Sequence, residues 1–304
     1  MAVVLDELPS GARVLFIRLR SLGDCVLTTP ALALLHAHRP DLHVGVMVES
    51  RFAGVYDGNP AVNEILPPSR FLAYQFNPSL TVNLHGGPQS AQMTLASFAR
   101  RRAGFGHYRT RYPYNLLIPR AQEILGEERT VHTAEHVASA LFWLGVPKQE
   151  IPRASLFVSG HPQQKAPRAI IHPFASAPGK AWPVDRFAGL AQWLRDDVKL
   201  PVTLIGAESD DFAPFSSFEV LRGADLDDLK RALRSATLFV GNDSGPAHMA
   251  AAFGLPVVVL YGSADPVVWA PWRTRSESII APDGLACVSL DQVRDAVHRL
   301  EAAL

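Results

Sequence analysis

The residues best placed for chemistry follow a short apolar run late in the chain. The loop after that run reads Gly-Asn-Asp-Ser-Gly-Pro-Ala-His, residues 241–248. Asp243 or Ser244 can cap a helix, and Pro246 suits the first turn of one. Unpaired N–H groups at such a helix start favour an anion, most often a phosphate. The block therefore predicts either an ordinary capped helix or a phosphate-binding loop in which Asp243, Ser244 and His248 contact the ligand.

A second group of candidates lies near the beginning of the chain. Residues 13–19, Arg-Val-Leu-Phe-Ile-Arg-Leu, are expected to form a buried strand, and the loop after it reads Arg20-Ser-Leu-Gly-Asp24. An aspartate after a strand is often only a helix cap, but a carboxylate there can also act as a general base. A similar choice applies to Lys180, which is either a cation for phosphate groups or a surface lysine stacked on Trp182.

Together these residues suit one type of reaction. A cation, a helix start and a hydroxyl group suit a diphosphate, and a carboxylate in the other half of the chain suits deprotonation of an acceptor hydroxyl. This division indicates group transfer from a nucleotide-activated donor. A cation and a helix dipole stabilise a departing diphosphate without a metal, so we expect none.

Two further patterns are less specific. His132-Thr-Ala-Glu-His136 has the residue order of one class of zinc site, but no third ligand is marked. We expect it to open a helix with a partly exposed face. Arginines within residues 100–120 are interleaved with aromatic residues, which is typical of a solvated face or of a patch for an anionic acceptor or membrane headgroups.

The composition is that of a globular protein with two domains. The chain has 304 residues, 48% of them hydrophobic and 19% charged. Lysine plus arginine equals aspartate plus glutamate at 29 each, so no net charge favours nucleic acid. No apolar run is long enough to span a bilayer, and the first residues lack the layout of a signal peptide. We therefore expect a cytoplasmic protein.

The elements that must position these residues alternate between strand and helix. The pattern restarts at residue 168, after a turn-rich segment in which we expect one strand at 154–158. It predicts an α/β class, with two Rossmann-like, doubly wound domains facing across a cleft. Helices are expected at 132–144, 248–253 and 289–304. The first loop holds one glycine and no G-x-G-x-x-G, which argues against a dinucleotide-binding oxidoreductase.

Several stretches share a pattern with a known family. They are Arg18-Leu-Arg-Ser-Leu-Gly-Asp-Cys-Val-Leu-Thr-Thr-Pro, Gly58-Asn-Pro, His172-Pro with Lys180-x-Trp-Pro, Gly241-Asn-Asp-Ser-Gly-Pro-Ala-His, and Gly262-Ser-Ala-Asp-Pro. With them the chain resembles glycosyltransferase family 9, the heptosyltransferases, over nearly its whole length.

The resemblance implies a GT-B fold, with residues 1–160 binding the acceptor and residues 161–304 binding the nucleotide-sugar donor. It implies an inverting, metal-independent glycosyltransferase without a cofactor. Such an enzyme moves a sugar, typically heptose from ADP-heptose, to a lipopolysaccharide core or another cell-surface glycan. Whether the last helix, at about residues 290–304, packs back on the first domain is left open.

Carried over by position, the resemblance also assigns roles to residues. Asp24 matches the catalytic base, and Lys180 matches a lysine that contacts the donor phosphates. Glu208 or Asp210 is expected to hold the nucleoside, and the spacing leaves that choice open. The donor-binding block is Asp243, Ser244, Gly245 and His248, and the residues expected on the acceptor side are Gly23, Arg20 and His85.

Some features of the sequence keep alternatives open. The segment before Lys180 has Ser176 as its only hydroxyl, and residues 70–120 carry no motif for a particular acceptor. The sugar, the base, the acceptor and the oligomeric state are therefore left open. A nucleotide-sugar epimerase on the same fold and a non-catalytic nucleotide-sugar-binding protein remain as alternatives. The main hypothesis expects an ADP-linked donor, a glycan or glycolipid acceptor, peripheral contact with the cytoplasmic face of the inner membrane, and no nucleic acid.

Overall fold

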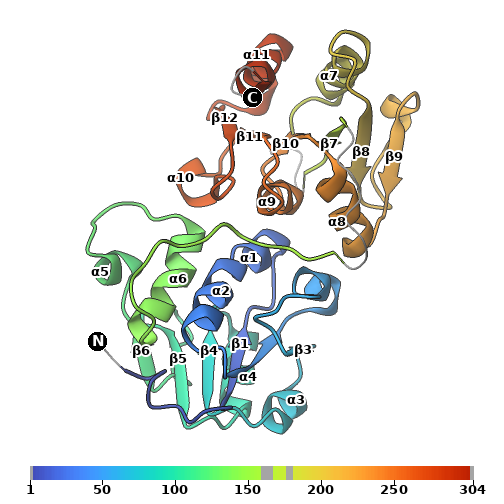
Figure 1. Cartoon of the computed structure of the whole chain (residues 1–304). Helices are drawn as coiled ribbons and strands as arrows, with labels where there is room; N and C mark the ends of the chain where they lie inside the picture. Colours follow the sequence, from blue (N-terminus) through green and yellow to red (C-terminus); the bar gives the residue numbers. More distant parts are fainter. Residues whose placement is uncertain (1–2, 159–166, 176–180, 302–304) are drawn as a thin grey trace. The chain divides into compact units, whose positions relative to one another are not determined.

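The chain folds into two compact units (Figure 1). The computed structural model describes residues 3–158, 167–175 and 181–301. The first unit comprises Met1–Phe157 and the second Val158–Leu304, close to the boundary expected after residue 160. Each unit holds a six-stranded sheet in which all neighbouring strands are parallel. The predicted α/β class with two doubly wound sheets is confirmed.

The sheet of the first unit has the strand order β3-β2-β1-β4-β5-β6. The winding of the chain therefore reverses between β1 and β4, and ligands of open parallel sheets bind outside the carboxyl ends of the strands at that reversal. All residues of β1 after Arg13 are buried, as expected for a central strand. The strands are β1 (Arg13–Ile17), β2 (His43–Met47), β3 (Glu64–Leu66), β4 (Leu80–Asn83), β5 (Arg101–Phe105) and β6 (Leu116–Ile118).

Helices cover both faces of this sheet. Helix α2 packs on α6, and α3 packs on α4. Part of the core is formed by Leu15 and Ile17 of β1 with Phe76 and Met93. The helical segments are α1 (Leu22–Val26), α2 (Thr29–His38), η1 (Ser50–Val55), α3 (Arg70–Gln75), α4 (Pro88–Ala96), α5 (Ala121–Leu125) and α6 (Thr133–Leu144).

The strand expected at residues 154–158 is wrong. This segment carries no regular secondary structure, although Ala154 and Leu156 are buried. The backbone N–H of Ser155 donates to Thr29 Oγ1 at 3.0 Å, so a side chain of α2 satisfies a group that a sheet would otherwise pair. The alternation of buried residues in this segment therefore reflects its contact with helix α2 and not pairing in a sheet.

The sheet of the second unit has the order β12-β11-β10-β7-β8-β9, which repeats the winding of the first. Its reversal lies between β7 and β10, so the carboxyl ends of these two strands mark the expected ligand position. The strands are β7 (Ala169–His172), β8 (Val202–Gly206), β9 (Glu219–Arg222), β10 (Leu238–Asn242), β11 (Val257–Tyr261) and β12 (Ser276–Ile280). The helical segments are α7 (Val184–Asp196), η3 (Ala213–Phe215), α8 (Leu226–Ser235), α9 (Gly245–Ala252), α10 (Pro266–Trp269), η4 (Leu285–Cys287) and α11 (Leu290–Glu301).

The last helix packs within its own unit. Val293, Ala296 and Val297 of α11 join the core that contains Leu190 and Leu194 of α7. Their spacing of three and four residues places them on one face of the helix, and that face contacts α7 and β12.

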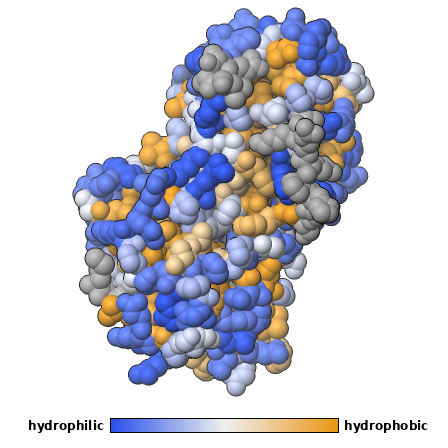
Figure 2. Space-filling view, viewed as in Figure 1, coloured by the Kyte–Doolittle hydropathy of each residue, from blue (hydrophilic) through white to orange (hydrophobic). Residues whose placement is uncertain are grey.

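The surface is mostly polar. On the face drawn in Figure 2, hydrophilic residues cover much of each unit, and apolar residues form separate patches. Among the described residues, none of the helices has the length and apolar character needed to cross a membrane.

Candidate functional site

Asp24 lies at the sheet reversal of the first unit. The loop after β1 leads directly into α1, where Asp24 is the third residue. Asp24 Oδ2 accepts hydrogen bonds from the backbone N–H of Ser21 at 3.2 Å and from Ser21 Oγ at 2.9 Å. These bonds form a capping box, so the helix-cap interpretation of this residue holds.

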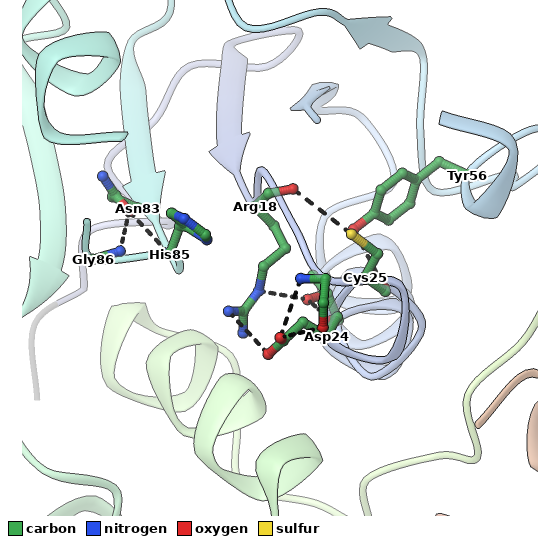
Figure 3. Close-up of polar contacts among 9 residues, drawn as sticks. Arg18, Asp24, Cys25, Tyr56, Asn83, His85 and Gly86 are labelled. Carbon is green, nitrogen blue, oxygen red and sulfur yellow. Dashed lines mark hydrogen bonds and ion pairs between the residues drawn. The ribbon is translucent and has the colours of Figure 1, made fainter. Parts of the chain in front are cut away.

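The second oxygen of Asp24 faces a buried cation. Arg18 Nη1 lies 3.3 Å from Asp24 Oδ1, and Arg18 Nε donates to Thr28 Oγ1 at 3.3 Å (Figure 3). The Arg18 side chain is 8% exposed and the Asp24 side chain 22% exposed. The carboxylate is therefore fixed through both oxygens and still reaches solvent, as a base acting on a bound hydroxyl must.

His85 follows the neighbouring strand β4. Asn83 Oδ1 accepts from the backbone N–H groups of His85 at 2.9 Å and Gly86 at 3.0 Å, which holds the loop in a tight turn (Figure 3). Burial and the cations of Arg18 and Arg20 lower the pKa of His85, so the imidazole is neutral at pH 7. The loops after β1 and β4 thus meet at the sheet reversal.

The other residues expected on the acceptor side lie in the same place. Gly23 is buried in α1, one residue before Asp24. The Arg20 side chain is 55% exposed, and its Nη1 lies 3.6 Å from Glu49 Oε1. The structure therefore brings Gly23, Arg20 and His85 together with Asp24.

Three side chains at this edge are absent from the sequence-based list. His107 and Tyr108 follow β5, and His136 lies on α6. The charges of Arg18 and Asp24 act on the pKa of both Tyr108 and His136, which shows that these groups lie near the carboxylate. Sequence reasoning missed His107 and Tyr108 because it did not predict β5. The position of β5 beside β4 places the residues after Phe105 at the same edge of the sheet.

In the second unit, Asn242 organises the reversal between β7 and β10. Its buried side chain accepts from the backbone N–H of Trp182 at 3.0 Å and donates to the Pro173 carbonyl at 3.0 Å. Trp182 is itself fully buried, and its Nε1 donates to the Val288 carbonyl at 2.9 Å. Trp182 is therefore a core anchor and not a surface platform for a lysine; Lys180 lies outside the described residues.

Ser244 caps the helix that faces this reversal. It is the N-cap residue of α9, and Gly245 and Pro246 open the helix. Ser244 Oγ lies within hydrogen-bond distance, 3.1 Å, of His172 Nδ1. Burial lowers the pKa of His172 to about 4 against the opposing charge of Asp210, so this partner is neutral at pH 7. The helix expected at 248–253 is present as α9, and it starts three residues earlier than expected.

Asp243 and His248 lie on either side of that cap. Asp243 is half-buried, and its charge raises the pKa of Tyr261, so its carboxylate lies near the end of β11. His248 is 4% exposed, and its ring contacts Trp269 edge-on with centroids 6.3 Å apart. The structure thus groups Asp243, Ser244 and Gly245 at the helix start and places His248 beneath them against α10.

The loop after β8 carries both acids considered for holding the nucleoside, and the two differ in their contacts. Asp210 Oδ2 accepts from the backbone N–H of Ala207 at 2.7 Å and thereby closes its own loop. Glu208 is exposed, and its carboxylate lies over Gly223, where an added Cβ would come within 2.4 Å of Oε2. Within the described residues no hydrogen bond engages Glu208, so its carboxylate is the one of the two available to a ligand.

The zinc-like pattern belongs to the start of α6. His132 Nδ1 accepts from the backbone N–H of Ala134 at 3.1 Å, and Glu135 accepts from the backbone N–H of His132 at 2.8 Å. Arg129 pairs with the same glutamate at 2.6 Å. These contacts form a second capping box. Across the described ranges, no group of three or more histidine, cysteine or acidic residues could hold a metal ion.

Comparison with known proteins identifies the family. The model of glycosyltransferase family 9 (heptosyltransferase) matches residues 74–295. The chain belongs to glycosyltransferase family 9. It is therefore a glycosyltransferase, and the family match favours this activity over the epimerase and non-catalytic alternatives.

Individual relatives agree with this assignment. Lipopolysaccharide heptosyltransferase 3 of Escherichia coli (strain K12) is 25% identical over 85% of this chain and 84% of its own length. The glycosyl transferase family 9 structure from Veillonella parvula DSM 2008 superposes with a TM-score of 0.85 at 21% identity, covering 97% of this chain and 98% of that one. The E. coli heptosyltransferase WaaC with ADP-2-deoxy-2-fluoro heptose gives a TM-score of 0.77 at 20% identity, covering 94% and 99%. The predicted GT-B fold is confirmed by these likenesses.

Proposed function

We propose that this family 9 enzyme transfers heptose from ADP-heptose to a lipopolysaccharide core acceptor, with inversion and without a metal ion. The observation that carries the proposal is the Asp24 carboxylate. It is held by Ser21 and Arg18 at a sheet reversal and remains partly exposed. The names of the relatives supply the substrate classes: one is a lipopolysaccharide heptosyltransferase, and another is a structure with an ADP-heptose analogue.

In the proposed reaction the acceptor hydroxyl loses its proton to Asp24. Its oxygen then forms a bond with the anomeric carbon of the donor, while the bond from that carbon to the β-phosphate oxygen breaks. The electron pair of that bond leaves with ADP, and attack from the opposite face inverts the anomeric configuration. Arg18 stays protonated and holds one carboxylate oxygen, so the base is oriented before the acceptor binds.

The second unit is proposed to bind the donor. The first N–H groups of α9 and the Ser244 hydroxyl would contact the diphosphate and stabilise the charge that develops on it. Lys180 is proposed to add a cation to the same group. We assign the nucleoside to Glu208, because Asp210 is occupied by its own loop. The first unit would then bind the acceptor, at the cytoplasmic face of the inner membrane.

Calorimetric titration with ADP, UDP, GDP and dTDP tests the donor assignment. We expect ADP to bind with the highest affinity, equally with and without magnesium, because a helix start and a lysine replace the metal. Transfer is then measured with ADP-heptose and lipopolysaccharide core oligosaccharides. Preference for another nucleotide would overturn the ADP-heptose assignment, and dependence on magnesium would overturn the metal-independent mechanism.

A further inference from the structure

Four side chains with rings lie at the edge of the first sheet that carries Asp24. We call them the imidazole wall, and they are His85, His107, Tyr108 and His136. They come from the loop after β4, the loop after β5 and helix α6. None of them takes part in the proton transfer proposed above, so their grouping at this edge calls for a separate explanation.

The wall is built on the end of β5. The His136 ring stacks on Phe105, with centroids 4.1 Å apart and planes inclined by 20°. His107 lies 5.6 Å from His136 and 5.0 Å from Tyr108, measured between ring centroids. Two imidazoles and a phenol are thus held in mutual contact over one buried aromatic residue.

Tyr108 joins this cluster to the loop that carries His85. Gly86, with φ +79°, lies directly under the Tyr108 ring, and an added Cβ would come within 2.7 Å of a ring carbon. A side chain at position 86 would therefore displace Tyr108. The loops after β4 and β5 are packed together by this contact, and the wall is a fixed surface.

The wall adjoins the proposed base. Arg18 and Asp24 both act on the pKa values of His85, Tyr108 and His136. The wall is also accessible, since His107 is exposed and the other three side chains are half-buried. A molecule that presents a hydroxyl to Asp24 therefore lies against these rings.

We propose that the imidazole wall is the acceptor subsite and that it binds a neutral sugar ring, not a phosphorylated or carboxylated one. This inference rests on the proposed function, since it takes Asp24 as the base that defines the acceptor position. A neutral imidazole offers one donor and one acceptor, which matches a sugar hydroxyl. The exposed faces of His107 and Tyr108 pack against the C–H groups of a pyranose ring.

The charge state of the wall supports a neutral ligand. Burial is the largest cause of the lowered pKa at His85, His107 and His136, and it brings that of His136 to about 4. All three imidazoles are therefore uncharged at pH 7.

Three arginines near the wall have other partners. Arg18 is bound to Asp24 and Thr28, and Arg20 faces Glu49. Arg111 donates to the Gly106 carbonyl at 3.3 Å. Arg109 follows Tyr108 on the same loop and is exposed to solvent.

Steady-state kinetics of His107→Phe and Tyr108→Phe test the subsite. Each change keeps a ring and removes polar atoms, so we expect KM for the acceptor to rise roughly five- to tenfold per lost hydrogen bond, with Kd for ADP unchanged. His298→Phe is the matched control, because His298 is an exposed imidazole against the edge of Trp193 in the other unit. Unchanged acceptor KM in both wall variants would overturn the proposal.

Binding measured without turnover separates this inference from the proposed function. Imidazole ¹H–¹³C NMR spectra of the Asp24→Asn variant are recorded with the methyl glycoside of heptose and with its phosphate monoester. Shifts of the His107 and His136 signals with the neutral glycoside support the subsite, even if transfer from ADP-heptose fails. Stronger binding of the phosphate monoester would overturn it, and so would shifts confined to histidines outside the wall.

Discussion

Asp24 combines two roles in one carboxylate at the scale of the single residue. Its Oδ2 completes the capping box of α1 with Ser21, and its Oδ1 faces Arg18. The bonds that hold the helix start therefore also fix the orientation of the proposed base. In the second unit Ser244 is the N-cap residue of α9, and its hydroxyl lies 3.1 Å from His172 Nδ1.

Replacing Asp24 by asparagine should remove transfer and leave donor binding intact. The amide oxygen still accepts from Ser21, so the cap persists, but the amide cannot take a proton. We expect kcat to fall by roughly 10²–10⁴-fold, with Kd for ADP within error of the parent protein. Asp41→Asn is the control, because Asp41 also pairs with an arginine, Arg39, at 2.7 Å. Weaker ADP binding with turnover retained would contradict the role of Asp24.

Ser244→Ala should weaken donor binding selectively. The change removes the hydroxyl proposed to contact the diphosphate, and we expect Kd for ADP to rise roughly three- to tenfold. Ser289→Ala is the matched control: Ser289 Oγ accepts from the backbone N–H of Gln292 at 3.2 Å at the start of α11. That variant should lower stability without changing ADP affinity. Equal ADP affinity in both variants would exclude Ser244 from the donor site.

At the scale of the element, β5 leads into the loop that carries two residues of the proposed acceptor subsite, His107 and Tyr108. Gly104 of this strand faces the buried Tyr114, and an added Cβ would lie 2.6 Å from its ring. Gly106, just after the strand, has its nearest neighbours at 3.5 Å and 3.8 Å. A methyl group would therefore fit at Gly106 but not at Gly104.

Gly104→Ala should therefore destabilise the protein where Gly106→Ala does not. Overpacking against a buried ring costs about 1–3 kcal/mol, whereas an ordinary contact leaves the free energy of unfolding nearly unchanged. Urea denaturation of the two variants measures this difference. Similar midpoints for both would show that Tyr114 moves aside without cost.

The same strand shows where sequence reasoning stops. The loop at 241–248 and the helix after it were predicted because an apolar run precedes them, and that run is β10, which is buried along its whole length. In β5 the first two residues are arginines, and Arg102 is held by the Ala99 and Pro113 carbonyls, so its strand pairing is invisible in an apolar pattern. The edge strands β6, β9 and β12 are short or only partly buried, and they were not predicted either.

The candidate site divides in a similar way. Motifs located Asp24 and the Asp243 to His248 block, since their loops follow apolar strands directly. His107 and Tyr108 carry no motif, and the position of β5 in the sheet brings them to this edge. His136 belongs to a pattern that was considered only for zinc, and it lies on α6. The choice between Glu208 and Asp210 also needed coordinates, because it depends on which carboxylate closes the loop.

At the scale of the whole molecule, each unit holds a half-buried histidine with a strongly lowered pKa. They are His136 in the first unit and His172 in the second, and burial lowers both pKa values from 6.5 to about 4. In the unfolded chain these groups take up a proton near pH 6.5. Their contribution to stability is therefore complete above pH 6.5 and is lost progressively as the pH falls to about 4.

Acid should accordingly destabilise both units within that window. For each histidine, a pKa of 6.5 in the unfolded chain and about 4 in the folded one lowers the free energy of unfolding by about 3 kcal/mol at most. We expect urea midpoints to fall steeply between pH 6.5 and 4.5, and the His136→Gln and His172→Gln variants to show shallower slopes. His298→Gln, with its exposed imidazole, should keep the parent slope. Parallel curves for all four proteins would contradict the prediction.

Asp24 both caps α1 and is the proposed base, and this has a consequence for which residues inactive descendants of this chain would keep. A copy that ceased to turn over would still need an acid or a comparable cap at this position, because α1 begins there. Persistence of an acid or an amide that keeps this cap would then reflect the requirements of folding and say nothing about chemistry. Arg18 is different, since α1 can form without it and its contacts serve the carboxylate and Thr28. In a copy that no longer acts as an enzyme, we therefore expect Arg18 to be replaced before Asp24.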